Sequence, residues 1–430
     1  MGQYSVAYGK RDEVFDISDQ YKVHLIHPRP SCPITDIKAG IVEALQSPIA
    51  SKPFRDSFSK GDNIAIVVSD VTRLWIRSHL LVPVLLDQLN QLGIPDSDIR
   101  VVMATGDHRD QTEEEHRMIV GEEVLRRVRI FDHDCMDADL VDLGKTSRGT
   151  KVFMNRMVAE ADKVILTGGI CYHSLAGFGG GRKSIAPGVS GYQTIQENHG
   201  LVFRSHPGTV GSGKMAGNPV AEDMDEIAVM VNPSFLLNVV VNEHKEFISI
   251  VAGNWREAHL AGTKIVENTC GIRDIEMADV IIASCGGYPK DIQLNQAIKA
   301  VENAAHAVRD GGDIILVSEC FGGPGPDAFL SRFKYRTCEE MRQALHDNFT
   351  MPGFVALLTR DIERTKTVYL VSELERTLVE SVGMKPAPSV RWALEQIIAQ
   401  HNPKTINIMP HATMTFPIVD KECCAASQGS

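Results

Sequence analysis

The sequence predicts an α/β protein with two Rossmann-like domains, each built on a mainly parallel sheet. Two observations predict this class. Short apolar strands alternate with amphipathic helices along the chain, and 430 residues exceed what one hydrophobic core usually supports. We place an N-terminal domain at 1–270 and a C-terminal domain at 275–400, with a linker at 271–274. The tail, 401–430, is expected to return to the N-terminal domain.

Apolar runs bounded by turn residues predict the strands, and apolar residues at helical spacing predict the helices between them. In the N-terminal domain, strands are expected at 63–69, 100–104, 128–131, 163–167, 235–241 and 246–251. The helices of that domain are expected at 78–92, 112–126, 154–161, 220–231 and 255–270. Beyond the linker we expect strands at 280–284, 313–318, 367–371 and 405–409, and a helix at 293–309.

The composition excludes several classes of partner. A formal net charge of -11 argues against nucleic-acid binding, because no basic stripe could neutralise phosphates. The first residues lack the apolar core of a secretory signal, and no apolar run reaches membrane-spanning length. The nine cysteines are scattered without a CxxC pair or zinc-ligand spacing, as in proteins of a reducing compartment. We therefore expect a cytoplasmic protein with no membrane or nucleic-acid partner.

The segment 177–188 is the most informative part of the chain. Four glycines fall within 177–181, and Arg182, Lys183 and Ser184 follow directly. Glycine brings no side-chain packing and costs backbone entropy, so this run indicates that bare backbone is needed, for example to close N–H groups on an anion. Lys183 would then lie against the bound group, in the desolvated setting that a covalent role requires.

A P-loop or a plain turn could also contain such a glycine run. A nucleotide-binding P-loop requires glycine immediately before its lysine, and Arg182 occupies that position. A structural glycine turn on a surface loop requires no ligand at all. The P-loop is disfavoured by the arginine, and the plain turn is disfavoured by the polar residues that accompany the segment.

Polar residues follow the predicted strands at the points where they end. Asp70 and Arg73 follow one strand, and His108 follows the next in a Gly-Asp-His turn. His173 follows a third strand, and the loop 285–290 follows the first strand of the C-terminal domain. Ligands of open parallel sheets bind outside the carboxyl ends of the strands. We therefore expect a single active-site cleft between the two domains.

Each of these side chains is also compatible with a purely structural role. Asp70 could simply cap a helix, whereas the guanidinium of Arg73 suits a carboxylate or phosphate. A lone histidine is usually structural, but His108 and His173 together suit a reaction that moves protons on both faces of a substrate. His199 is either a metal ligand or a buried hydrogen-bonded histidine, and neither an HExxH motif nor a His/Cys cluster accompanies it.

One further pair lies in the C-terminal domain. Gln296 and Lys299 are three residues apart, on one face near the N-terminus of a predicted helix. That end of a helix favours anions, although a solvated helix face would show the same pattern.

Taken together, these motifs resemble the nickel-pincer lactate racemase family, whose members racemise or epimerise 2-hydroxy acids. The resemblance extends over nearly the whole chain, and the glycine–lysine segment is its most specific part. The matching pieces are Asp70-x-x-Arg73, Gly106-Asp107-His108, the segment from His173 to Ile185, Asn198-His199-Gly200 and Gln296-x-x-Lys299.

In that family a lysine carries a covalently attached pyridinium-3,5-bisthiocarboxylic acid mononucleotide, and nickel is held by its two sulfurs, a ring carbon and one histidine. The resemblance implies that Lys183 is the attachment point, that His199 is the nickel ligand, and that His108 and His173 are the paired acid–base residues. It implies substrate-carboxylate contacts for Arg73, Gln296 and Lys299. It implies further cofactor contacts for Asp70, Thr72, Gly179, Gly180, Gly181, Arg182 and Ser184.

The implied reaction inverts C2 of a 2-hydroxy acid. One histidine removes the hydroxyl proton while hydride leaves C2 for the cofactor ring, and the planar 2-oxo acid then takes hydride back on its other face. Asn295 stands beside Gln296, where lactate-specific members are expected to have an aromatic residue, so the substrate side chain stays open. The alternatives are a sugar-acid 2-epimerase with the same cofactor and a non-catalytic protein that binds a phosphate or nucleotide ligand. Cofactor-synthesis enzymes are implied as maturation partners.

Overall fold

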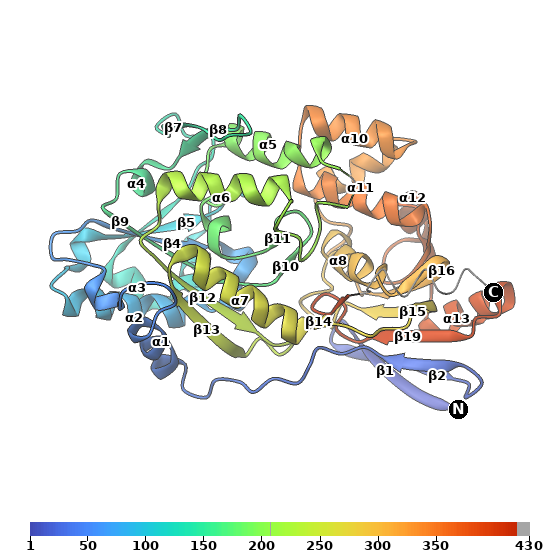
Figure 1. The fold of residues 1–430 in the computed structure, drawn as a ribbon. Helices are drawn as coiled ribbons and strands as arrows, with labels where there is room; N and C mark the ends of the chain where they lie inside the picture. Colours follow the sequence, from blue (N-terminus) through green and yellow to red (C-terminus); the bar gives the residue numbers. More distant parts are fainter. Residues whose placement is uncertain (207, 419–430) are drawn as a thin grey trace. The chain divides into compact units, whose positions relative to one another are not determined.

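The computed structural model describes residues 1–206 and 208–418 (Figure 1). The chain forms two compact units. Residues 31–267 make one of them, which we call the inserted unit, and residues 1–30 together with the chain from Asn268 onward make the other, which we call the terminal unit. The predicted boundaries are therefore wrong at the N-terminus, because residues 1–30 belong with the C-terminal part of the chain.

The inserted unit is built on a six-stranded sheet with the order β13-β12-β9-β4-β5-β6. Neighbouring strands are parallel, except that β13 is antiparallel to β12. The strands are β4 (Ile64–Ser69), β5 (Ile99–Ala104), β6 (Arg129–Asp132), β9 (Lys163–Gly169), β12 (Phe235–Val241) and β13 (Phe247–Gly253). Every residue of β12 is buried, as expected for a central strand that is covered on both faces.

Helices cover both faces of this sheet (Figure 1). They are α1 (Ile37–Gln46), α2 (Ser78–Gln91), α3 (Glu113–Arg127), α4 (Arg156–Ala159), α5 (Tyr192–Gly200), α6 (Pro219–Val231) and α7 (Trp255–Cys270). α2 and α3 pack side by side, and α4 contacts β4 and β5. The predicted helix at 154–161 is shorter in the structure, because Met154 ends a strand and Asn155 caps α4 through its side chain.

The inserted unit also contains two small hairpins and several 3₁₀ helices, two of which bear on the candidate site. One hairpin joins β7 (Val141–Lys145) to β8 (Lys151–Met154), and the other joins β10 (Tyr172–His173) to β11 (Gly177–Phe178). These two 3₁₀ helices are η2 (Val71–Ile76), directly after β4, and η4 (Gly181–Ser184), in the glycine segment.

The terminal unit has a fully parallel six-stranded sheet with the order β18-β17-β16-β15-β19-β3. Its strands are β3 (Lys22–Leu25), β15 (Ala278–Ser284), β16 (Val308–Val317), β17 (Thr367–Val371), β18 (Lys385–Ala387) and β19 (Thr405–Met409). β19 lies between β15 and β3, so the expected return of the tail to the N-terminal domain is wrong for this strand. Residues 419–430 of that predicted tail lie outside the described residues.

The helices of this unit are α8 (Leu294–Ala304), α9 (Asp327–Leu330), α10 (Cys338–Asp347), α11 (Met351–Glu363), α12 (Arg376–Ser381) and α13 (Val390–His401). α8 packs against β15 and β16. It ends at Ala304, earlier than predicted, because the next strand already begins at Val308. The predicted linker contains β14 (Gly271–Ile272), which pairs with β20 (Phe416–Pro417).

An antiparallel hairpin of β1 (Gly2–Tyr8) and β2 (Arg11–Ile17) covers part of the sheet of the terminal unit. Val6 and Phe15 from this hairpin share a buried cluster with Ile282 from β15, Ile408 from β19 and Leu394 from α13. The prediction of an α/β protein with mainly parallel sheets is confirmed for both units.

Candidate functional site

A chain of polar contacts lies at the carboxyl ends of β4 and β5 in the inserted unit. Asp70 directly follows β4, and its Oδ2 lies 2.5 Å from Nδ1 of His108, which follows β5. Thr72 donates its hydroxyl to Asp70 Oδ1 at 2.5 Å, and Arg73 donates to the Thr72 hydroxyl at 3.0 Å. Three residues predicted from strand ends, Asp70, Arg73 and His108, are therefore brought together.

The Asp70 carboxylate is buried and charged. Burial acts to raise its pKa, but the hydrogen bond from His108, the positive charge of that imidazole, and the bond from Thr72 outweigh burial and lower the pKa. The alternative that Asp70 only caps a helix is not supported, since its side chain makes no capping hydrogen bond to η2 within the described chain. Because the Nδ1–H of His108 donates to Asp70, the other ring nitrogen, Nε2, is left to exchange a proton.

The hairpin of β10 and β11 fixes the second predicted histidine. His173 lies opposite Gly177 in the hairpin, and its Nδ1 accepts hydrogen bonds from the backbone N–H groups of Leu175 and Ala176, both at 3.2 Å. Its Nε2 lies 3.1 Å from Nζ of Lys183. Sequence reasoning names His173 and Lys183 separately, and the structure places them in contact.

The hydrogen bonds at His173 determine the protonation state of this pair. A neutral imidazole has one donor nitrogen and one acceptor nitrogen. Since Nδ1 accepts two backbone bonds, Nε2 carries the hydrogen and donates it to Lys183, which must accept as a neutral amine. Burial is the largest cause that lowers the pKa of Lys183, followed by the positive charge of Arg73, and the pKa falls to about 7. Lys183 is therefore a potential nucleophile near neutral pH.

The glycines before Lys183 are required by close packing. A Cβ atom on Gly181 would lie 2.6 Å from the ring of His259, and one on Gly180 would lie 2.6 Å from Oδ1 of Asn238. The Gly181 N–H donates to that same oxygen at 2.8 Å, and the Gly179 N–H donates to the carbonyl of Cys171 at 2.8 Å. The amides of Gly179 and Gly181 are thus used within the fold, and the cofactor contacts of the three glycines stay a prediction.

Arg182 and Ser184 also hold the loop in place. The Arg182 side chain is 2% exposed, donates to the carbonyl of Ala176 at 3.0 Å and pairs with Asp225 of α6 at 3.1 Å. Ser184 donates its hydroxyl to the carbonyl of Thr167 in β9 at 3.2 Å. Both side chains face protein groups, so the structure supports a positioning role for them, and their predicted cofactor contacts stay a prediction.

His199 lies on α5 and is 4% exposed. Burial, with a smaller contribution from the charge of Lys183, lowers the pKa of His199 to about 3. Its imidazole is therefore neutral at physiological pH, which is the form that binds a metal ion.

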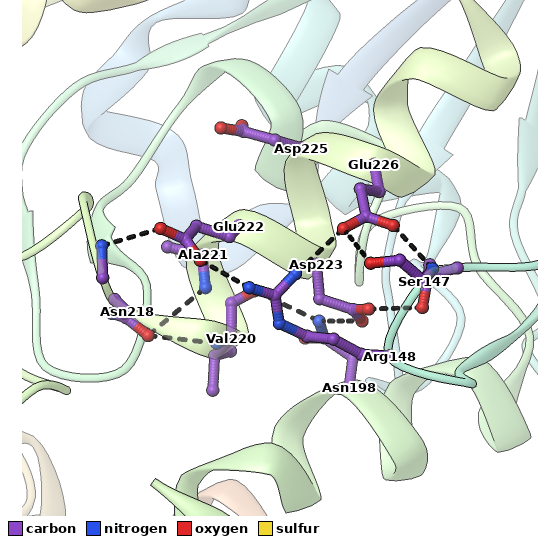
Figure 2. Close-up of polar contacts among 12 residues, drawn as sticks. Ser147, Arg148, Asn198, Asn218, Val220, Ala221, Glu222, Asp223, Asp225 and Glu226 are labelled. Atoms are coloured by element: carbon purple, nitrogen blue, oxygen red, sulfur yellow. Dashed lines mark hydrogen bonds and ion pairs between the residues drawn. The ribbon is translucent and has the colours of Figure 1, made fainter. Parts of the chain in front are cut away.

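A buried carboxylate ties α5 to the neighbouring elements (Figure 2). Asp223 of α6 is fully buried and accepts hydrogen bonds from Asn198 at 2.8 Å and from Thr146 at 2.5 Å. Arg148, in the β7–β8 turn, pairs with Glu222 and Glu226 on the same helix. Asn198 precedes His199, so this cluster anchors the helix that carries the predicted metal ligand.

Within the described residues, no group of three or more His, Cys, Asp or Glu side chains could hold a metal ion. A single buried imidazole is a poor metal site by itself, because protein metal centres normally have three or four ligands. It fits a metal whose other ligands come from an organic group attached nearby, and Lys183 is placed for such an attachment.

Two predicted substrate residues lie in the terminal unit. Gln296 and Lys299 are on the first turns of α8, as the sequence predicts, with Gln296 exposed and Lys299 half-buried. Asn295 is beside them, and its buried Oδ1 has no hydrogen-bond partner among the described residues.

Sequence reasoning does not find three supporting features of this site. It gives Asp70 to the cofactor and does not include the bond from Asp70 to His108. It also does not include Asn238 in β12, or His259 in α7, which donates to the carbonyl of Gly179 at 2.9 Å. An asparagine inside an otherwise apolar strand is the available signal for Asn238, because a buried amide needs hydrogen-bond partners.

Comparison with known proteins identifies the class to which this fold and site belong. The chain matches the family model of the lactate racemase N-terminal domain over residues 8–211 and that of the lactate racemase C-terminal domain over residues 273–413. It is 31% identical to a lactate racemase of Thermoanaerobacterium thermosaccharolyticum over 422 residues, which cover 95% of this chain and 98% of the relative. It is 35% identical to a lactate racemase of Lactiplantibacillus plantarum over 369 residues, 84% of this chain and 86% of the relative.

Two solved structures are also similar. The lactate racemase apoprotein from Thermoanaerobacterium thermosaccharolyticum matches with a TM-score of 0.88 at 28% identity, covering 98% of this chain and 100% of the other. A protein from Thermotoga maritima matches with a TM-score of 0.66 at 17% identity over 91% of this chain and 100% of the other, which shows the fold alone.

The chain therefore belongs to the lactate racemase family, which is a family of isomerases. This confirms the resemblance inferred from the motifs. In the part of the chain that the structure describes, no helix is both long enough and apolar enough to cross a lipid bilayer.

Proposed function

We propose that this protein racemises or epimerises a 2-hydroxy acid at C2, with a nickel-pincer nucleotide attached to Lys183. The observation that carries the proposal is the contact between Lys183 and His173, in which a lysine is held as a neutral amine. A binding protein for a free nucleotide would need a charged lysine, whereas covalent attachment needs the neutral form.

Lys183 would hold the cofactor and His199 would be the one protein ligand to nickel. When bound, this group supplies a pyridinium ring that accepts and returns hydride. The chain supplies the remaining functions, which are proton transfer, substrate binding and positioning.

His108 is proposed to take the proton of the substrate hydroxyl at Nε2. Asp70 fixes the ring through Nδ1 and stabilises the imidazolium that forms, so it is a positioning residue in this proposal. His173 is proposed to be the acid–base residue for the opposite enantiomer, a role that requires its Nδ1 to take up a hydrogen in place of the two backbone bonds. Once the Lys183 nitrogen has formed its covalent bond it no longer accepts from Nε2 of His173, and that imidazole becomes available to the substrate.

Arg73 and Lys299 are proposed to bind the substrate carboxylate, with Gln296 as a neutral hydrogen-bond donor. A carboxylate gains most from charge-assisted contacts, and a guanidinium can donate two parallel bonds to it. Asn295 favours a second candidate within the same chemistry. Its buried Oδ1 has no hydrogen-bond partner within the described chain and could accept a hydrogen bond from a substrate hydroxyl group. A polyhydroxylated sugar acid is therefore the alternative substrate class.

The test is co-expression with the cofactor-synthesis enzymes, followed by intact-mass measurement, peptide mapping and elemental analysis. We expect an adduct on Lys183 and nickel in the parental protein, and no adduct in Lys183→Ala. His199→Ala should keep the adduct and lose nickel.

The loaded protein is then assayed with pure enantiomers of short, aromatic and polyhydroxylated 2-hydroxy acids, with products resolved by chiral chromatography. The Thermoanaerobacterium thermosaccharolyticum lactate racemase, expressed in the same cells, is the positive control for loading. If that control carries the adduct and this chain does not, the proposed function is wrong. If the chain carries the adduct but converts no 2-hydroxy acid, it is a binding protein instead.

A further inference from the structure

We propose that His173 has an earlier role than acid–base catalysis: it presents the Lys183 amine for attachment of the cofactor. In this role His173 is a positioning residue for Lys183. The inference rests on the proposed function, because it concerns how the cofactor becomes attached.

The imidazole of His173 is held rigidly by its own hairpin. Leu175 and Ala176 donate two backbone hydrogen bonds to Nδ1, which prevents that nitrogen from carrying a hydrogen. The turn is itself held, since the carbonyl of Ala176 accepts from the buried Arg182 guanidinium. Gly177 closes the hairpin at a φ of 77°, and a Cβ atom there would lie 2.3 Å from the carbonyl oxygen of Lys214. The direction and hydrogen content of Nε2 are therefore set by the backbone.

The fixed position of His173 Nε2–H determines the state of the Lys183 amine. A lysine in water is an ammonium ion at neutral pH and has no lone pair to form a bond. The Lys183 nitrogen lies 3.1 Å from Nε2 of His173 and accepts a hydrogen bond into its lone pair, so it is held in place as a neutral amine until the incoming acid displaces the Nε2–H. Removing His173 leaves a half-buried amine without this donor, which allows it to rotate and to take a proton from solvent.

The attachment is a condensation that transfers no electrons. The Lys183 nitrogen forms a bond to the carbon of a thiocarboxylic acid, and the carbon–oxygen bond of that acid breaks. The oxygen leaves as water with two hydrogens, one from the acid and one from the amine, and a thioamide results. The proton that the nitrogen loses goes to the departing oxygen, and the His173 Nε2–H, which is within hydrogen-bond distance of the reacting nitrogen, positions the amine for this attack.

The experiment measures the adducted fraction of Lys183 by intact mass after co-expression with the cofactor-synthesis enzymes. We expect His173→Ala to lower the adducted fraction at least about tenfold after a short induction, because a misplaced reacting group can slow a step by this much or more. His173→Asn keeps an acceptor near Nδ1 for the hairpin amides but cannot reach Lys183, so it should load as poorly as the alanine variant. His173→Gln places an amide near the position of Nε2 and should restore part of the loading.

His108→Ala is the matched control, since it removes the other proposed acid–base residue from the Asp70 cluster. It should load like the parental protein, and thermal unfolding of the unloaded proteins checks that the variants fold. Parental loading in His173→Asn overturns this inference and leaves the proposed function intact. Absence of an adduct in the parental protein overturns both. A loss of loading in His108→Ala equal to that in His173→Ala also overturns the inference, because the effect would then not depend on contact with Lys183.

Discussion

At the residue scale, the site contains two histidines whose ring nitrogens are assigned by different partners. His108 gives its Nδ1 hydrogen to a carboxylate, and His173 uses Nδ1 to accept backbone bonds. In their neutral forms the first presents Nε2 as a hydrogen-bond acceptor, and the second presents Nε2–H as a donor. Two residues of one type are thus held in opposite tautomers.

The sequence predicts that Asp70 and His108 follow neighbouring strands, and it cannot identify their pairing. Asp70 and His108 are 38 residues apart, and nothing local to either residue indicates the other. The strand ends predict that both lie at one sheet edge, which the pairing of β4 with β5 confirms. Hydrogen-bond partners depend on side-chain geometry within that edge, which spacing along the chain does not encode.

His108→Ala should lower kcat/KM by about 10²–10⁴ in both directions, as loss of a general base typically does. Both directions should fall by the same factor, because a variant cannot change the equilibrium constant between two enantiomers. Asp70→Asn keeps a hydrogen-bond partner for His108 but loses the charge, so its loss should be smaller. Initial rates from each pure enantiomer, normalised to adduct content, provide the measurement. An unchanged rate in His108→Ala would show that this histidine is not a base in the reaction.

At the element scale, sequence patterns are most accurate where strands are continuously buried. β17 and β19 begin and end at the predicted residues, and both are buried along nearly their whole length. The β1–β2 hairpin is missed because it alternates exposed and buried residues in a polar N-terminal segment. Two-residue strands such as β10 and β11 have no sequence signal of their own, yet they determine where His173 lies.

The buried hydrogen bonds of Asp223, which join α6 to α5 and to the β7–β8 turn, should make a large contribution to stability. Asp223→Ala removes the acceptor of the Thr146 hydroxyl and one of the two acceptors of the Asn198 amide, which should cost about 2–4 kcal/mol in the free energy of unfolding. Arg148→Ala is the control in the same cluster. Its ion pairs are partly exposed, so its loss should be about 1 kcal/mol or less. Urea unfolding of the two variants measures both, and equal losses would contradict this account.

α11 carries a carboxylate that should make stability depend on pH. Burial raises the pKa of Glu363 to about 7, with Arg360 opposing weakly, and neither oxygen has a hydrogen-bond partner among the described residues. In the unfolded chain this pKa is about 4.3. Between these values the folded state holds a proton that the unfolded state has lost, so the free energy of unfolding falls as pH rises.

Glu363→Gln removes this titration. Relative to the parental protein, the variant should gain about 3 kcal/mol in the free energy of unfolding between pH 4 and pH 8, with most of the gain complete by pH 7. Urea titrations across that range measure the difference. Glu395→Gln, at an exposed glutamate of α13, is the control for the substitution of a glutamate by glutamine. A flat difference for Glu363→Gln would show that the carboxylate is ionised in the folded protein.

At the scale of the whole molecule, the sequence predicts two α/β units, but it assigns residues 1–30 to the wrong unit. The alternation of strands and helices predicts the fold class of each unit, because this pattern reflects local burial. It does not say which sheet a short N-terminal strand joins, since β3 pairs with a strand nearly 400 residues away. That one substrate contacts residues of both units stays a prediction.

Kinetic measurements on variants of Arg73, in the inserted unit, and Lys299, in the terminal unit, can test whether both residues bind the same substrate. Each single alanine variant should lower kcat/KM by about ten- to a hundredfold, corresponding to about 1.5–3 kcal/mol for one charge-assisted contact. If both bind one carboxylate, the double variant should deviate from the product of the single effects, because the second loss removes a contact from an already misplaced group. Parental kinetics in either single variant would remove that residue from the substrate site.

The N-terminal hairpin of β1 and β2 is synthesised long before the strands against which it packs. A ribosome adding about 5–20 residues per second spends roughly 10–50 s on residues 31–267 alone, after the hairpin has been made and before the strands it packs against exist. The inserted unit is one continuous stretch of chain and can fold during that interval. The apolar side chains of the hairpin, Val6, Tyr8, Phe15 and Ile17, are not yet covered by the sheet of the terminal unit. Newly made chains therefore display a small apolar surface that the finished protein lacks, and a chaperone that holds the emerging N-terminus would be of most use during this interval.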